Sequence, residues 1–198
     1  LTVNETFLFR EPVHLELLSN KLVPGMLLNR PAGKAIKVLC AGCSTGEEPY
    51  SIAMALHEKY GLHSKHLFSI TGFDIDREVL KKAEEGVFGG YSFRALDGGL
   101  RDKYFEPSGK DKHRIKERLR DWIRFIEVNL QDDIYPDELN GADVIFYRNV
   151  SIYFDPKTQK GIFAKLSGLL NEGGYMVLSS TETYSHNANV LSLVEMDG

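Results

Sequence analysis

Short apolar runs, separated by polar and glycine-rich segments, recur along this chain. Runs of this length that are rich in β-branched and aromatic residues are typical of buried parallel strands. They predict strands at 36–40, 67–73, 122–128, 142–147 and 175–178. The last of these follows a predicted turn, Asn-Glu-Gly-Gly.

Between the strands, apolar residues recur at helical spacing and predict helices at 47–60, 76–85 and 156–170. Strands that alternate with helices indicate an α/β fold, a doubly wound Rossmann-like sheet with helices on both faces. In such sheets ligands bind beyond the carboxyl ends of the strands, where the strand order reverses. The residues that directly follow the strands are therefore the candidates for a functional site.

Two segments stand outside the alternation. The N-terminal segment 1–30 contains a helix pattern from Glu11 that includes Leu15, Leu18 and Leu22, and we expect a domain over 31–198 after it. A charged segment at about 104–122 interrupts the alternation before the strand at 122–128. It is either a solvated hairpin or helix, or a small basic surface that docks an acidic protein partner.

Composition narrows the class of protein. The chain has 198 residues, 42% of them hydrophobic, which suits one globular domain. The net charge of -4 gives no basic excess for nucleic acid, and no apolar run approaches the roughly 20 residues of a membrane span. Two cysteines make no disulfide framework, so we expect a cytoplasmic protein. We also expect a monomer. The chain does not begin with Met, and we expect a fragment of a longer protein.

The stretch "VLCAGCSTGEEPY" (38–50) contains both cysteines, Cys40 and Cys43, and allows three interpretations. A redox dithiol needs nearby positive charge, but Glu47 and Glu48 follow and would hinder ionisation of the thiol. A structural zinc site needs about four ligands, and no second Cys-x-x-C or His pair completes one, so we expect no metal. The third interpretation is a cofactor loop.

A strand, a glycine turn and a helix can cradle a phosphate, but Gly42-x-x-x-Gly46 lacks the P-loop Lys and is not G-x-G-x-x-G. Glu47 and Glu48 in the first helical turn would repel a pyrophosphate, although they also simply favour the helix dipole. An acidic glycine loop accommodates a cationic nucleoside without phosphate, such as S-adenosylmethionine (SAM).

Asp74 ends the second predicted strand, about one βαβ step after the glycine loop. An acid at this point can accept hydrogen bonds from both ribose hydroxyls of a nucleoside. Asp76 is instead the natural N-cap of the helix that follows. This arrangement indicates a nucleoside cofactor but does not by itself separate SAM from NAD.

Four collinear motifs carry a resemblance: "NETFLFRE" (4–11), "AGCSTGEEPYSIAM" (41–54), "FDIDREVLKKAEEGVF" (73–88) and "ADVIFYRNVSIYFD" (142–155). Together they resemble the CheR family of chemotaxis receptor methyltransferases. The resemblance implies a class I methyltransferase sheet with a small inserted β-subdomain, SAM as cofactor and S-adenosylhomocysteine (SAH) as product. It also implies O-methylation of glutamate side chains in the cytoplasmic domain of a chemoreceptor.

The resemblance further implies which residues form the site. Arg10 and Tyr153 are the expected catalytic residues, Arg10 holding the substrate carboxylate and Tyr153 positioning it. The expected cofactor contacts are Asn4, Thr6, Arg10, Ala41, Gly42, Glu47, Glu48, Asp74, Asn129, Leu130, Arg148 and Asn149. Of the two adjacent glutamates, we expect Glu48 to meet the amino acid end of the cofactor. A glutamate is already ionised at neutral pH, so the reaction needs no general base.

Two other functions stay open. One is a CheR-like regulatory module of a larger signalling protein, which binds the cofactor but methylates weakly or acts on a different acceptor. The other is an NAD-linked reductase, which the acids of the glycine loop disfavour.

Overall fold

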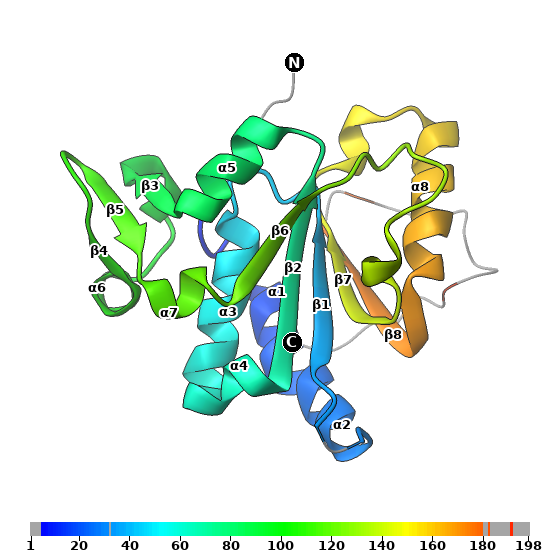
Figure 1. The fold of residues 1–198 in the computed structure, drawn as a ribbon, viewed down its shortest axis with the longest axis horizontal. Helices are drawn as coiled ribbons and strands as arrows, with labels where there is room; N and C mark the ends of the chain where they lie inside the picture. The colour runs from blue at the N-terminus through cyan, green and yellow to red at the C-terminus, as the bar shows by residue number, and fades with distance from the viewer. Residues whose placement is uncertain (1–4, 32, 180–181, 183–190, 192–198) are drawn as a thin grey trace.

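The computed structural model describes residues 5–31, 33–179, 182 and 191. A five-stranded parallel sheet runs through its centre in the order β6-β2-β1-β7-β8 (Figure 1). The strands are β1 (Ile36–Ala41), β2 (Phe68–Asp74), β6 (Ile123–Glu127), β7 (Ala142–Tyr147) and β8 (Leu170–Leu178). Because β1 pairs with both β2 and β7, the strand order reverses beside it, and the predicted doubly wound α/β fold is confirmed.

Successive side chains of β1 pack alternately into the two hydrophobic cores, one on each face of the sheet. Val38 and Cys40 pack in the core that contains α3 (Glu47–Tyr60), whereas Leu39 and Ala41 pack in the core that contains α8 (Pro156–Gly168). This period of two is the pleat of a strand buried on both faces. Figure 1 shows α3 and α8 on opposite sides of the sheet.

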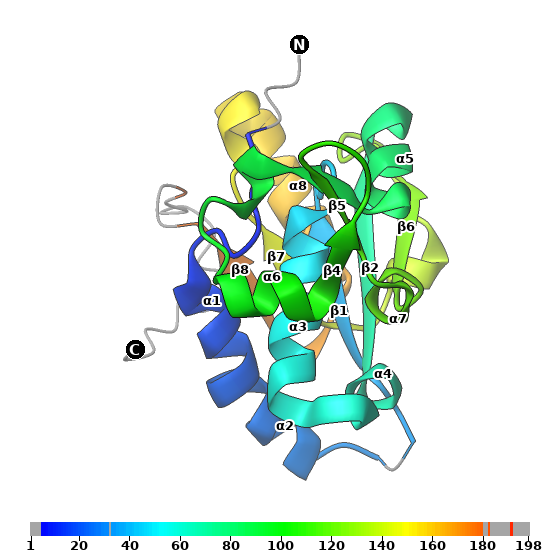
Figure 2. The ribbon, with the colours of Figure 1, turned by 90° about the vertical axis from the view of Figure 1, so that its left-hand side faces the viewer.

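The predicted N-terminal helix is present from Pro12 to Leu28. It consists of α1 (Pro12–Glu16), the π-helical turns η1 (Leu17–Leu22) and α2 (Val23–Leu28). Leu15, Leu18 and Leu22 are all buried, as the pattern predicted. The helix lies beside α3 (Figure 2) and contacts it, so it covers the face of the sheet that carries α3.

Most predicted boundaries agree with the structure. The helix at 47–60 is α3, and α5 (Arg77–Glu85) begins after Asp76, whose carboxylate accepts hydrogen bonds from two amides of the first turn. The prediction that Asp76 caps this helix is confirmed. The remaining short helical turns are η2 (Gly61–His63), α4 (Ser64–Leu67), η4 (Asp137–Leu139) and η5 (Ser151–Tyr153).

The predicted end of α8 and start of β8 were wrong. The helix stops at Gly168 rather than at 170, and β8 begins at Leu170, where we expected a turn over 171–174. The strand is irregular there, because its register against β7 shifts between Ala142 and Val144. Gly173 has φ +75°, which lets the chain bend without leaving the sheet.

The inserted subdomain is larger than the predicted segment 104–122. Its antiparallel sheet has the order β3-β5-β4, formed by β3 (Val87–Gly89), β4 (Phe105–Pro107) and β5 (Lys112–Ile115). The central strand β5 needs a partner on each side, and β3 supplies one from a position ahead of the predicted segment. Three helical elements complete the subdomain, η3 (Gly90–Phe93), α6 (Gly98–Tyr104) and α7 (Glu117–Arg120). In the described part of the chain, no helix has the length and apolar character of a membrane span.

Candidate functional site

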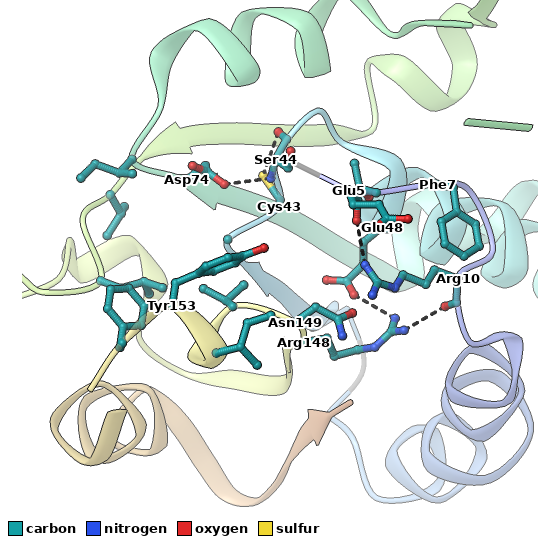
Figure 3. Close-up of a pocket in the computed structure, with 18 of the residues that line it drawn as sticks. Glu5, Phe7, Arg10, Cys43, Ser44, Glu48, Asp74, Arg148, Asn149 and Tyr153 are labelled. Atoms are coloured by element: carbon teal, nitrogen blue, oxygen red, sulfur yellow. Dashed lines mark hydrogen bonds and ion pairs between the residues drawn. The ribbon is translucent and has the colours of Figure 1, made fainter. Parts of the chain in front are cut away.

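A cavity of about 490 Å³ lies at the carboxyl ends of the parallel strands, where the strand order reverses (Figure 3). The loops after β1, β2, β6 and β7 all contribute to its wall. Residues 5–11, which precede α1 and border one side of the cavity, are called the strap below. The volume of the cavity lies within the range of small-molecule and cofactor sites, about 300–1,000 Å³.

Glycine at position 42 lets two loops meet at the base of the cavity. The amides of Gly42 and Cys43 both donate to the carbonyl of Phe73, at 2.8 and 3.0 Å, which turns the chain sharply after β1. Gly42 has φ +72°, and a Cβ placed there would lie 2.5 Å from Cγ2 of Val150. The loops after β1 and β7 therefore approach each other as closely as a backbone without a side chain allows.

The two cysteines do not have the environment of a redox dithiol. Cys40 and Cys43 are both free and buried. Burial raises the pKa of both thiols well above the ordinary value, and Glu48 raises them further. Cys40 belongs to the hydrophobic core, while Cys43 lines the cavity as part of the glycine loop.

Asp74 lies at the cavity at the end of β2, where the sequence placed a ribose acceptor. Its Oδ2 accepts a hydrogen bond from the amide of Ser44 at 2.9 Å, and its Oδ1 accepts one from the amide of Asp76 at 3.1 Å. These bonds fix the carboxylate between the glycine loop and α5. Each oxygen keeps further acceptor capacity for a ligand hydroxyl.

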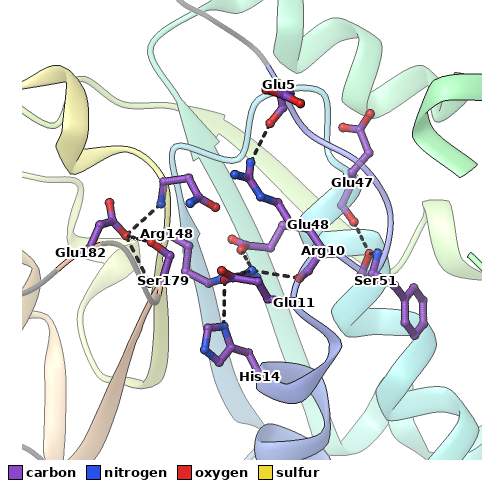
Figure 4. A network of polar contacts seen from close by, with 12 residues as sticks. Glu5, Arg10, Glu11, His14, Glu47, Glu48, Ser51, Arg148, Ser179 and Glu182 are labelled. Atoms are coloured by element: carbon purple, nitrogen blue, oxygen red, sulfur yellow. Dashed lines mark hydrogen bonds and ion pairs between the residues drawn. The ribbon is translucent and has the colours of Figure 1, made fainter. Parts of the chain in front are cut away.

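Arg148 joins three parts of the site (Figure 4). Its side chain is 3% exposed, and its guanidinium donates to Oε2 of Glu48 at 2.9 Å and to Oε2 of Glu11 at 2.7 Å. It also donates to the carbonyl of Arg10 at 2.9 Å. Burial raises the pKa of Glu48, and Arg148 opposes that effect. The loop after β7 is thus tied both to α3 and to the strap.

Glu47, unlike Glu48, does not line the cavity. Its side chain is buried and accepts hydrogen bonds from Oγ1 of Thr45 at 2.6 Å and Oγ of Ser92 at 2.9 Å. Burial raises the pKa of this carboxyl. Adjacent helical residues point in directions about 100° apart, so only one of the pair can face the cavity. Ala41, another predicted contact, is buried in β1 and also lies outside the lining.

The cavity brings together most of the predicted residues. These are Thr6, Arg10, Gly42, Glu48, Asp74, Asn129, Leu130, Arg148, Asn149 and Tyr153. Asn4 lies outside the described residues. Sequence reasoning missed several lining residues that are neighbours of predicted ones, namely Phe7, Cys43, Ser44, Ile75, Val150 and Ile152. It also missed Ser51, which lies three residues after Glu48 in α3; that helical spacing from a predicted cavity residue was the available signal.

Arg10 and Tyr153 lie on opposite sides of the cavity (Figure 3). Arg10 belongs to the strap, and its Nη1 donates to the carbonyl of Glu5 at 2.7 Å. Tyr153 belongs to η5 and is 52% exposed at the mouth. A side chain that enters from solvent would therefore pass between a guanidinium and a phenol.

Glu182 holds the loop that carries Asn149 and Tyr153, a role that the sequence did not reveal. Its carboxylate accepts hydrogen bonds from the amides of Asn149, Val150 and Ser151 at 2.9, 3.1 and 3.0 Å. Burial alone would raise the pKa of Glu182, but these and further hydrogen bonds outweigh it and hold the pKa below its ordinary value. The loop after β7 is therefore fixed by an ionised carboxylate.

The charges in the cavity are mixed. The described lining contains three carboxylates and two guanidiniums, from Glu5, Glu48, Asp74, Arg10 and Arg148, and it contains no lysine. This set suits a ligand that carries both a cation and a carboxylate better than one that carries a pyrophosphate. In the described residues, no three His, Cys, Asp or Glu side chains are grouped to hold a metal ion.

A family model described as "CheR methyltransferase, SAM binding domain" matches residues 4–198. The chain belongs to the CheR methyltransferase family. It is 36% identical to the "Chemotaxis protein methyltransferase" of Borreliella burgdorferi over 195 residues, which cover 96% of this chain and 68% of that protein. It is 34% identical to "Chemotaxis protein methyltransferase 2" of Vibrio cholerae, covering 96% of this chain and 66% of that one. The CheR chain thus spans about two thirds of the length of these relatives.

Two further comparisons bear on the CheR chain. The "Probable biofilm formation methyltransferase WspC" of Pseudomonas aeruginosa is 37% identical, and the match covers 92% of this chain and 42% of that protein. Among solved structures, the "DszA carbon methyltransferase" superposes with a TM-score of 0.53 at 16% identity, covering 84% of this chain and 35% of that one. The latter likeness shows the fold, that of a class I methyltransferase sheet.

Proposed function

We propose that this CheR domain binds SAM and transfers its methyl group to glutamate side chains of a chemoreceptor's cytoplasmic domain. The observation that carries the proposal is the cavity at the strand-order reversal, with Arg10 and Tyr153 at its mouth and mixed charges inside. The names of the relatives support a chemotaxis substrate. We infer that the protein acts in the cytoplasm and as a monomer.

The residues of the cavity fit SAM group by group. Asp74 has free acceptor capacity for the ribose hydroxyls, and Asn129 and Leu130 would lie at the adenine. Glu48 would accept from the amino group. Arg148 also lines the cavity, and its guanidinium would attract the ligand's carboxylate by its positive charge.

The chemistry requires alignment rather than acid–base catalysis. When bound, SAM supplies an electrophilic methyl group, and SAH is the product. Arg10 would hold the substrate carboxylate through paired N–H donors, and the hydroxyl of Tyr153 would orient it from the opposite side. A glutamate of pKa about 4.3 is ionised at neutral pH, so its oxygen can attack without a base. With the cofactor and the substrate side chain in place, the walls of the cavity would exclude water from the reacting groups.

Calorimetry and methyl transfer test the proposal in sequence. Titration with SAM, SAH and NAD should give heat with the first two only, and binding of NAD alone would contradict the assignment of the cavity. Transfer of labelled methyl to chemoreceptor cytoplasmic fragments, read as base-labile methanol, tests the substrate. Arg10→Ala should lower transfer about a hundredfold with a modest loss of SAH affinity, because a misaligned carboxylate reacts slowly. Arg124→Ala, on the exposed ion pair with Glu138, is the matched control and should leave both unchanged.

The second candidate is a CheR-like module of a larger signalling protein with a weak or different methyl acceptor. The relative that favours it is WspC, of whose length the match covers less than half. SAM binding without transfer to chemoreceptor fragments would select this candidate over the first.

A further inference from the structure

In the strap, Arg10 lies between two residues that have a sterically costly backbone conformation. Phe9 and Glu11, the residues on either side of Arg10, have φ values of 58° and 53°. Residues with a Cβ rarely adopt this left-handed region, because the Cβ approaches a backbone oxygen. Such a conformation persists only where surrounding contacts enforce it.

Three consecutive residues of the strap are tethered to other elements. The amide of Leu8 donates to the carbonyl of Ser92 at 2.9 Å, and the amide of Phe9 donates to Oγ of Ser51 at 2.9 Å. The carbonyl of Arg10 accepts from Arg148 at 2.9 Å. The tether to Ser51 is the one that a single side-chain change can remove without altering a charge.

The hydroxyl of Ser51 is oriented for this role. It donates its proton to the carbonyl of Glu47 at 2.6 Å (Figure 4). Its lone pairs therefore remain for the amide of Phe9. The carboxylate of Glu47 accepts from Oγ of Ser92 at 2.9 Å. The first turn of α3 therefore supports two tethers of the strap, one through the backbone of Glu47 and one through its side chain. Ser51 is 2% exposed and Glu47 is 3% exposed.

We propose that Ser51 is a positioning residue for methyl transfer, which acts by fixing the strap so that Arg10 faces the substrate carboxylate, and that Glu47 supports it. This inference rests on the proposed function of Arg10. Without the hydroxyl, the amide of Phe9 loses its acceptor and the left-handed backbone is free to relax. A displacement of about 1 Å at a reacting group can cost about a hundredfold in rate.

Kinetics of Ser51→Ala test the inference against a matched control. Ser167→Ala is that control, because Ser167 is also buried in a helix and bonds the carbonyl four residues back, Phe163, at 2.7 Å, away from the cavity. Ser51→Ala should lower kcat about tenfold to a hundredfold with the SAH Kd changed less than about threefold. Ser167→Ala should change neither.

A double-mutant cycle decides whether Ser51 acts through Arg10. In an Arg10→Ala background, Ser51→Ala should cause no further loss of kcat, because the side chain that it positions is gone. An equal loss in both backgrounds, or no loss in either, would overturn the inference. If Ser51→Ala folds poorly, Ser92→Ala replaces it, since it removes only the hydroxyl bond to Glu47 and should show a smaller loss with the same dependence on Arg10.

Hydrogen exchange at the amide of Phe9 gives a readout independent of catalysis. Ser51→Ala should speed its exchange about tenfold, and Ser167→Ala should not. If the wild-type chain transfers no methyl, the proposed function fails while exchange still reports on the tether. If exchange at Phe9 is unchanged in Ser51→Ala, the positioning inference fails whatever the kinetics show.

Discussion

Replacing Gly42 with alanine tests whether the close contact between the loops after β1 and β7 requires a glycine. Gly42 has φ +72°, and its new Cβ would lie 2.5 Å from Cγ2 and 3.1 Å from Cγ1 of Val150. Ordinary contact between carbons begins near 3.5 Å. Either Val150 or the glycine loop must therefore move, and both line the cavity.

The cost has two parts that the structure separates. The left-handed backbone costs alanine about 1–2 kcal/mol, and forcing a methyl group into a packed contact costs about 1–3 kcal/mol. Alanine also lowers the conformational entropy of the unfolded chain, which offsets about 0.4–1 kcal/mol of these costs. Gly42→Ala should therefore lower the free energy of unfolding by about 1–5 kcal/mol, a large share of the 5–15 kcal/mol typical of a domain.

Gly173→Ala is the matched control. Gly173 has φ +75°, but nothing lies within 4 Å of a Cβ placed there, so only the backbone cost applies. Unfolding by urea should show Gly42→Ala to be less stable than Gly173→Ala by about 1–3 kcal/mol. Val150→Ala should recover most of that difference in the Gly42→Ala background. Equal losses in the two glycine variants, or no recovery with Val150→Ala, would refute the argument from loop contact.

Two further predictions concern groups away from the reaction. Burial alone would raise the pKa of Asp143, but hydrogen bonds from Arg30, the Lys37 amide and Asn171 outweigh it and hold the pKa below its ordinary value. Because the pKa of this carboxyl is lower in the folded than in the unfolded chain, its ionised form stabilises the fold at pH values above the unfolded pKa. The free energy of unfolding, measured by urea titration, should therefore fall as the pH drops below about 4. It should fall less steeply in Asp143→Asn. The cysteine thiols, with raised pKa, should react with a maleimide at neutral pH only after unfolding; rapid labelling of the folded chain would contradict their burial.

The central sheet was predictable because its signal is local. Strands buried on both faces appear as continuous apolar runs, and the run 142–147 coincides with β7. The small sheet was harder, because Val87–Gly89 becomes a strand only by pairing with β5, about 25 residues later in the chain. No periodicity within three residues can reveal such a partner.

The site was predictable to the level of the loop but not of the side chain. The glycine loop and Asp74 followed from strand ends and turn chemistry. It could not be predicted that Glu48 faces the cavity and Glu47 does not, because both lie in the first turn of α3. Their orientations depend on their partners, Ser92 for Glu47 and Arg148 for Glu48. Those partners belong to distant segments, so the sequence around the loop cannot distinguish the two acids.

Backbone strain explains why the rest of the site is hidden in the sequence. In the described part of the chain, five non-glycine residues have positive φ, and four of them lie in the strap or the cavity wall: Phe9, Glu11, Ser44 and Asn149. Each is held by a side chain 30 to 137 residues away, in order Ser51, Arg148, Asp74 and Glu182. Local propensity argues against all four conformations, so only long-range hydrogen bonds can select them. Removal of any one of these acceptors or donors should therefore loosen the cavity at that point.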